Sequence, residues 1–159
     1  MSRLAPSLRG VASSVWEVIG VIDTQGARAE WTLPGELDAV RAARHAVRDT
    51  LRGWELEAAV GDLAVLLVSE LVTNSLRYAH GPIGVRLIRL PSHDASVPSR
   101  AALLVEVSDP LPDPPRARPA GPDDEGGRGL QLVACSAARW GTRKGRSGKT
   151  VWFELSLPG

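Results

Sequence analysis

Residues 69–78 read Ser-Glu-Leu-Val-Thr-Asn-Ser-Leu-Arg-Tyr, within an apolar segment that runs from Leu56 to about Ala79. Leu and Val recur in this segment at helical spacing, and His80-Gly81-Pro82 follows it directly. The pattern predicts a long helix that ends at the His-Gly-Pro sequence. Because the helix is rich in Leu and Val, we expect much of it to be buried.

Polar side chains interrupt one face of this helix. Glu70 and Asn74 are four residues apart and Arg77 is seven residues after Glu70, so the three share a face. The opposite side carries a core stripe of Val68, Val72 and Leu76. A carboxylate beside an amide oxygen, on a helix otherwise so apolar, suits Mg²⁺ binding and proton acceptance. A solvated polar face is the alternative explanation of the same pair.

The elements around this helix predict an α+β fold. Before it we expect strands at 15–22 and 29–33 and a helix at 36–52; after it, strands at 84–90 and 101–108, a helix at 129–138, and strands at 140–143 and 150–157. This order favours a two-layer α/β sandwich, with a mixed, mostly antiparallel sheet and the helices on one face. Residues 1–14 are expected to form a flexible arm, and residues 15–159 a single domain.

Composition excludes several classes of protein. The 159 residues are 43% hydrophobic and 23% charged, with a formal net charge of +1, so the whole chain is not marked as nucleic-acid-binding. Cys135 is the only cysteine, which rules out an internal disulfide and a cysteine metal cluster. No apolar run approaches the ~20 residues of a membrane span, and no signal peptide is evident. We therefore expect a soluble, cytoplasmic domain.

Two further motifs suit a nucleotide. Asp109 ends the strand at 101–108, where a carboxylate can accept a hydrogen bond from an exocyclic amine such as that of adenine; a turn-forming Asp is the alternative. Residues 125–130 read Glu-Gly-Gly-Arg-Gly-Leu and open a helix, and such an N-terminus is an anion site suited to phosphate. The Pro-rich segment at about 110–127 predicts a lid over this site; a flexible linker is the alternative.

In this order, the three motifs resemble the N, G1 and G2 boxes of GHKL (Bergerat-type) ATPases and kinases, the superfamily of gyrase, histidine kinases and MutL. The resemblance covers roughly residues 29–157. Within the superfamily, the short length and the Ser-Glu-x-x-Thr-Asn core at residues 69–74 are most similar to the anti-sigma-factor serine/threonine kinases.

The resemblance implies that the cofactors are ATP and Mg²⁺, with Glu70 as the base that activates a serine hydroxyl and Asn74 as the Mg²⁺ ligand. Asp109 would bind the adenine amine. The other implied nucleotide-binding residues are Arg77, Gly127, Arg128, Gly129 and Leu130, with a phosphate contact from Lys149 in the Gly-Lys-Thr turn before the last strand.

The sequence departs from the family at the G1 box. Relatives show Asp-x-Gly-x-Gly there, whereas residues 109–113 read Asp-Pro-Leu-Pro-Asp and lack both glycines. Because proline cannot donate a backbone hydrogen bond, we expect either weaker nucleotide binding or a reshaped lid.

Two basic features need separate interpretation. The Gly-Lys-Thr at 148–150 is not a P-loop, because a strand follows it and Arg143 occupies the place of the first glycine. The basic turn around it is typical of a solvated surface rather than a nucleic-acid site. The helix at 36–52 carries a basic stripe, which could steer an acidic partner or simply be solvated; its members are Arg41, Arg44, Arg48 and Arg52.

The resemblance therefore implies an ATP-dependent regulatory protein kinase that binds a sigma factor and phosphorylates an anti-anti-sigma protein, with no direct contact to nucleic acid or membrane. A homodimer through the sheet is a further implication of the resemblance. The alternative is a non-catalytic module that sequesters a protein and has a degenerate nucleotide site, which the missing glycines favour. An ATPase coupled to conformational change is a third hypothesis, which the lack of a following transducer domain disfavours.

Overall fold

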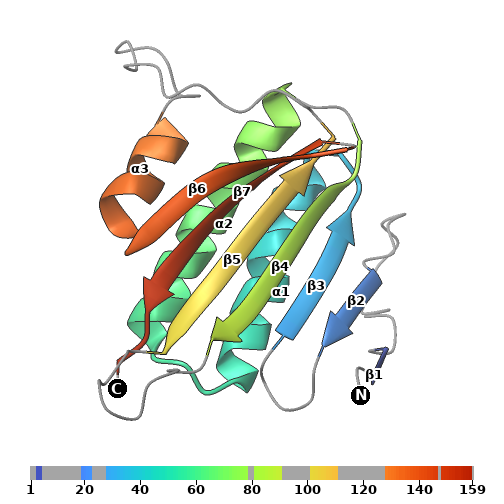
Figure 1. Cartoon of the computed structure of the whole chain (residues 1–159). Coiled ribbons are helices and arrows are strands. Elements are labelled where there is room, and N and C mark those ends of the chain that lie inside the picture. The colour runs from blue at the N-terminus through green and yellow to red at the C-terminus, as the bar shows by residue number, and fades with distance from the viewer. Residues whose placement is uncertain are drawn as a thin grey trace.

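The computed structural model describes residues 3–4, 19–22, 28–78, 81–90, 101–110, 128–146 and 148–158. Figure 1 shows a sheet with its helices on one side. The elements in chain order are β1 (Arg3–Leu4), β2 (Ile19–Ile22), β3 (Arg28–Leu33), α1 (Asp38–Gly53), α2 (Ala58–Tyr78), β4 (Ile83–Leu90), β5 (Ala102–Asp109), α3 (Arg128–Ser136), β6 (Arg139–Gly145) and β7 (Gly148–Ser156). The predicted α+β sandwich is confirmed.

The strands form one seven-stranded sheet in the order β1-β2-β3-β4-β5-β7-β6. Every described strand pair is antiparallel, so the expected mixed sheet is wrong in that respect. Strands β5 and β6, which precede and follow α3, run parallel, but β7 lies between them and pairs antiparallel with both, so the parallel strands are not neighbours. Within the predicted arm, Arg3–Leu4 pairs with β2, while residues 1–2 and 5–14 lie outside the described part of the chain.

Alternation along the strands separates the two faces of the sheet. In β5, the side chains of Leu103, Val105 and Val107 are buried toward the helices. In β7, the same face carries Val151 and Phe153. This period of two places alternate residues on the core side, so Asp109, at the end of β5, also points toward the helix layer.

Helices α1 and α2 pack on each other and cover this face. Helix α1 buries Ala39, Ala43, Val47 and Leu51, and its basic stripe lies on the other side, with three of the four arginines exposed. The helix begins two residues later than predicted. Leu37 before it is 89% exposed and therefore contributes nothing to the core.

Helix α2 supplies much of the core. Its predicted apolar stripe is confirmed, because Val68 and Val72 are fully buried and Leu76 packs partly buried against them. By length and composition α2 is also apolar enough to cross a membrane, contrary to our expectation of no such run. A core helix meets the same test, and the packing of α2 between α1, α3 and the sheet accounts for its apolar character.

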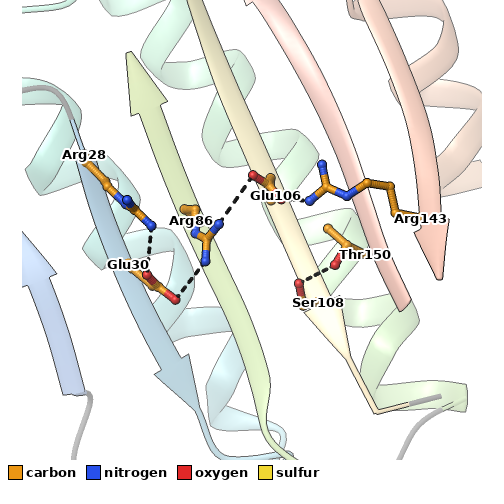
Figure 2. Close-up of polar contacts among 7 residues, drawn as sticks. All are labelled: Arg28, Glu30, Arg86, Glu106, Ser108, Arg143 and Thr150. Atoms are coloured by element: carbon orange, nitrogen blue, oxygen red, sulfur yellow. Dashed lines mark hydrogen bonds and ion pairs between the residues drawn. The ribbon is translucent and has the colours of Figure 1, made fainter. Parts of the chain in front are cut away.

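The face of the sheet away from the helices carries a chain of ion pairs (Figure 2). Glu30 contacts Arg28 at 3.8 Å and Arg86 at 3.3 Å, and Arg86 reaches Glu106 at 3.8 Å. Arg143 of β6 also pairs with Glu106. The two arginines cover Glu106, which explains why a glutamate on an open face is only 6% exposed.

Strands β6 and β7 extend further than predicted. The expected basic turn at 143–149 is much shorter, because Arg143 and Lys144 pair with Thr150 and Lys149 in the ladder. Gly145 and Gly148 face each other at its end. This longer hairpin carries Lys149 into the buried face of the sheet, where it is 7% exposed.

Candidate nucleotide-binding site

The polar face of α2 borders a cavity of about 650 Å³ between α2 and α3. This volume is within the range of small-molecule sites, about 300–1,000 Å³. Helix α2 contributes four lining residues and α3 three: Glu70, Thr73, Asn74, Arg77, Gln131, Leu132 and Cys135. The face predicted from spacing alone therefore lies at a cavity rather than in open solvent.

The N-terminus of α3 lies directly against this face. A Cβ added to Gly129 would be 3.0 Å from Asn74 Nδ2 and 3.5 Å from Glu70 Cβ. A larger residue at position 129 would require the Asn74 amide to shift by a few tenths of an ångström, so glycine favours this close approach of α3 to α2. Because the unpaired backbone N–H groups of a helix N-terminus attract anions, the structure brings an anion site next to the Glu70–Asn74 pair.

Asp109 lies beside this arrangement, on the core side of β5. Its Oδ2 accepts a 2.8 Å hydrogen bond from Ser75 Oγ and lies 3.6 Å from Lys149 Nζ. Ser75 follows Asn74 in α2, so the carboxylate is tied to the same helix that lines the cavity. All three residues are buried: Asp109 and Ser75 are 6% exposed and Lys149 is 7% exposed.

The chain around Asp109 is tightly packed. A Cβ on Gly148 would lie 1.9 Å from the carbonyl oxygen of Asp109, so no larger residue fits there. Pro110, which follows Asp109 in the G1 segment, lies near Gly81, whose φ of +130° is typical of glycine. The rest of the altered G1 segment, residues 111–113, lies outside the described residues.

Comparison with known proteins agrees with this geometry. The family described as the histidine kinase-like ATPase domain matches residues 33–155. The chain belongs to this family. Its fold is similar to that of the RsbU and RsbW domains of Rv1364c from Mycobacterium tuberculosis, with a TM-score of 0.58 and 17% identity. The match covers 82% of the present chain and 32% of that chain, so this ATPase-family domain spans about a third of the longer protein. No curated protein matches by sequence.

Family membership supports ATP binding, and the structure distinguishes among the residues predicted to contribute. Glu70, Asn74 and Arg77 meet at the cavity, with Gly129 against two of them. Gly127 lies outside the described residues, as does the side chain of Arg128, whose backbone begins α3.

Two residues predicted to bind nucleotide do not line this cavity, and their contacts stay predictions. The side chain of Leu130 is 4% exposed and packs in the hydrophobic core, because the first turn of α3 turns that residue toward the sheet. Lys149 does not line the cavity, and its ammonium is held at the Asp109 carboxylate instead. The phosphate contact expected of Lys149 is therefore not supported by its position.

Sequence reasoning missed several residues at the site. Thr73 is three residues from Glu70, and Gln131 and Cys135 are four apart on α3, so helical spacing could have identified them. Ser75 gave no such indication, because its partner Asp109 is 34 positions away along the chain.

A metal ion would need ligands beyond the Asp, Glu, His and Cys side chains that the described residues bring together. No group of three His, Cys, Asp or Glu side chains that could hold a metal occurs among the described residues. Glu70 and Asn74 supply two oxygen-bearing side chains on one cavity wall. That donor set fits Mg²⁺, which is usually held by one or two protein groups together with water and substrate phosphates.

Proposed function

We propose that the protein binds Mg²⁺·ATP in the cavity between α2 and α3 and transfers the γ-phosphoryl group to a serine or threonine of a partner protein. One observation carries this proposal: Glu70, Asn74 and Arg77 line a single cavity, and the N-terminus of α3 packs against Asn74. A carboxylate, a metal-binding amide, a cation and an anion-binding helix N-terminus are the groups that phosphoryl transfer requires.

Each group has a defined task in this proposal. Bound Mg²⁺ would neutralise charge on the phosphates, and Asn74 would hold it. Arg77 and the backbone N–H groups of α3 would bind phosphate oxygens. Glu70 would accept the proton of the attacking serine or threonine hydroxyl. The hydroxyl oxygen would bond to the γ-phosphorus while the bond from phosphorus to the bridging oxygen breaks, and ADP would leave with that oxygen. Catalysis would rest chiefly on positioning and electrostatics.

The partner would be an anti-anti-sigma protein, as the similarity of residues 69–74 to the anti-sigma kinases suggests. The basic stripe of α1 supports protein binding, because three of its four arginines are exposed on a helix whose other side is buried in the core. Such a stripe would attract an acidic surface, such as that of a sigma factor, and would speed association. A homodimer remains part of the proposal.

A second function is favoured by one observation. Asp109, the family's adenine contact, is already bound to Ser75 and lies beside Lys149 in a buried cluster. If this cluster does not admit adenine, the protein would act by sequestering its partner without phosphorylating it.

Phosphotransfer can be tested with γ-³²P-ATP, Mg²⁺ and a set of purified anti-anti-sigma proteins. We expect labelled serine or threonine on a partner with the wild type, and none with Glu70→Gln, which should bind ATP equally well. Thr73→Ser, at the same cavity wall, is the matched control and should retain transfer. Absence of both ATP binding and transfer to any protein would favour the sequestering function.

A further inference from the structure

Lys149 and Asp109 are register partners on neighbouring strands. They face each other across the β5–β7 ladder, both on the side of the sheet toward the helices. Nζ of Lys149 lies 3.6 Å from Oδ2 of Asp109, and the side chains are 8% and 2% exposed respectively. Lysines are rarely so buried, so this ion pair needs an explanation.

A purely structural role explains it poorly. Buried ion pairs lose so much hydration that apolar residues of similar size are often equally stabilising. The pair does not line the cavity but is tied to its wall, because Ser75, which donates to Asp109, directly follows the cavity-lining Asn74. The close contact between Gly148 and the carbonyl of Asp109 also fixes the backbone on both sides of the pair.

The pair presents a hydrogen-bond acceptor directly beside a donor. A carboxylate has about four lone-pair sites and an ammonium has three N–H groups, so each can serve a ligand in addition to its neighbour. Adenine has the complementary edge, with its exocyclic N6 amine as donor beside the ring nitrogen N1 as acceptor. Guanine has the opposite pattern there, with O6 as acceptor and N1–H as donor.

We propose that Lys149 is a base-specificity residue, whose ammonium donates to adenine N1 while Asp109 accepts from the N6 amine. The inference rests on the proposed nucleotide site and assigns Lys149 to the base rather than to the phosphates. Lys149 selects against guanine because two donors would meet at N1, just as two acceptors would meet at O6 and Asp109.

Titration calorimetry with ATP, 1-deaza-ATP and GTP, each with Mg²⁺, tests this assignment on the wild type and on Lys149→Met. 1-Deaza-ATP has a C–H in place of N1 and is otherwise ATP. We expect the wild type to bind ATP at least about tenfold more tightly than 1-deaza-ATP, the usual effect of one hydrogen bond to a charged group. Lys149→Met should bind ATP and 1-deaza-ATP equally.

The outcomes separate the two proposals. If the wild type binds ATP and 1-deaza-ATP equally, or if Lys149→Met still discriminates between them, the role of Lys149 is wrong and the nucleotide site stands. If the wild type binds none of the three nucleotides, both the proposed function and the role of Lys149 are wrong. A structural ion pair would lower the affinity of Lys149→Met for both adenine nucleotides by the same factor. The comparison of the two ligands on wild-type protein requires no variant and is therefore independent of folding.

Discussion

Ser75 Oγ donates a 2.8 Å hydrogen bond to Asp109 Oδ2 and thereby joins α2 to the end of β5. Asn74 lines the cavity and Ser75 holds the carboxylate, so consecutive residues of one helix position the two ends of the candidate site. A helix sends consecutive side chains in different directions, which is how one segment serves both the cavity and the core.

Loss of this hydrogen bond should destabilise the protein. Ser75→Ala leaves the buried Asp109 carboxylate without one of its donors, and we expect a loss of about 1–3 kcal/mol in the free energy of unfolding. Ser108→Ala is the matched control, because the Ser108 hydroxyl bonds Thr150 on the open face, where water can replace it. Urea unfolding of both variants checks this, and equal losses would contradict the account.

Gly129→Ala should weaken nucleotide binding more than stability. The new Cβ would lie 3.0 Å from Asn74 Nδ2, so that amide must shift by a few tenths of an ångström at the cavity wall. We expect roughly a tenfold loss of affinity for Mg²⁺·ATP, equivalent to about 1.4 kcal/mol.

Gly61→Ala, on α2, is the control for that variant. A Cβ at Gly61 meets nothing within 4 Å, so this change should leave affinity unaltered. It should raise stability by about 0.5–1 kcal/mol, because alanine favours a helix interior over glycine. Unchanged ATP affinity in Gly129→Ala would mean that the first turn of α3 is not part of the site.

Gly148→Ala should be strongly destabilising. Its Cβ would lie 1.9 Å from the carbonyl oxygen of Asp109, so β5 and β7 must separate, at a cost of at least about 1–3 kcal/mol. Gly145→Ala is the matched comparison, because its Cβ would lie at an ordinary contact distance of 3.6 Å from the carbonyl oxygen of Gly148. Thermal melts should show a clear drop for the first variant and a small change for the second.

Two groups of ion pairs on the sheet, the chain around Arg86 and the separate Arg139–Glu154 pair, should contribute unequally to stability. Arg86 bridges Glu30 and Glu106, and Arg86→Met should cost about 1 kcal/mol, since its side chain is 36% exposed and water screens part of the interaction. Arg139→Met should change stability little, because Arg139 is 71% exposed and lies 3.9 Å from Glu154. Melting at low and high salt distinguishes them, and equal, salt-independent losses would contradict this ranking.

The fold could largely be predicted because periodicity is a local property. The apolar spacing of α2 and the alternation of β7 each follow from a single segment, and both are confirmed. The Glu70–Asn74–Arg77 face could be predicted for the same reason. Helix starts were less certain, since α1 and α2 each begin two residues later than their apolar patterns suggested.

What could not be predicted depends on strand register and on packing between distant segments. The Asp109–Lys149 pair exists only because β5 and β7 align those two positions. The burial of Glu106 likewise depends on arginines from β4 and β6. Leu130 was assigned to the site from a motif, but the packing of α3 turns its side chain into the core.

Calorimetric titration of the protein with ATP in the presence of Mg²⁺, repeated with Asn74→Ala, tests the central claim most directly. The account predicts saturable binding at one site and an affinity reduced at least about tenfold in the variant, as expected when a group that binds the metal–phosphate complex is removed. Circular dichroism should show the variant folded, because Asn74 is only partly buried. Absence of saturable binding to the wild type, or equal affinity in folded Asn74→Ala, would contradict the claim that the cavity between α2 and α3 is the nucleotide site.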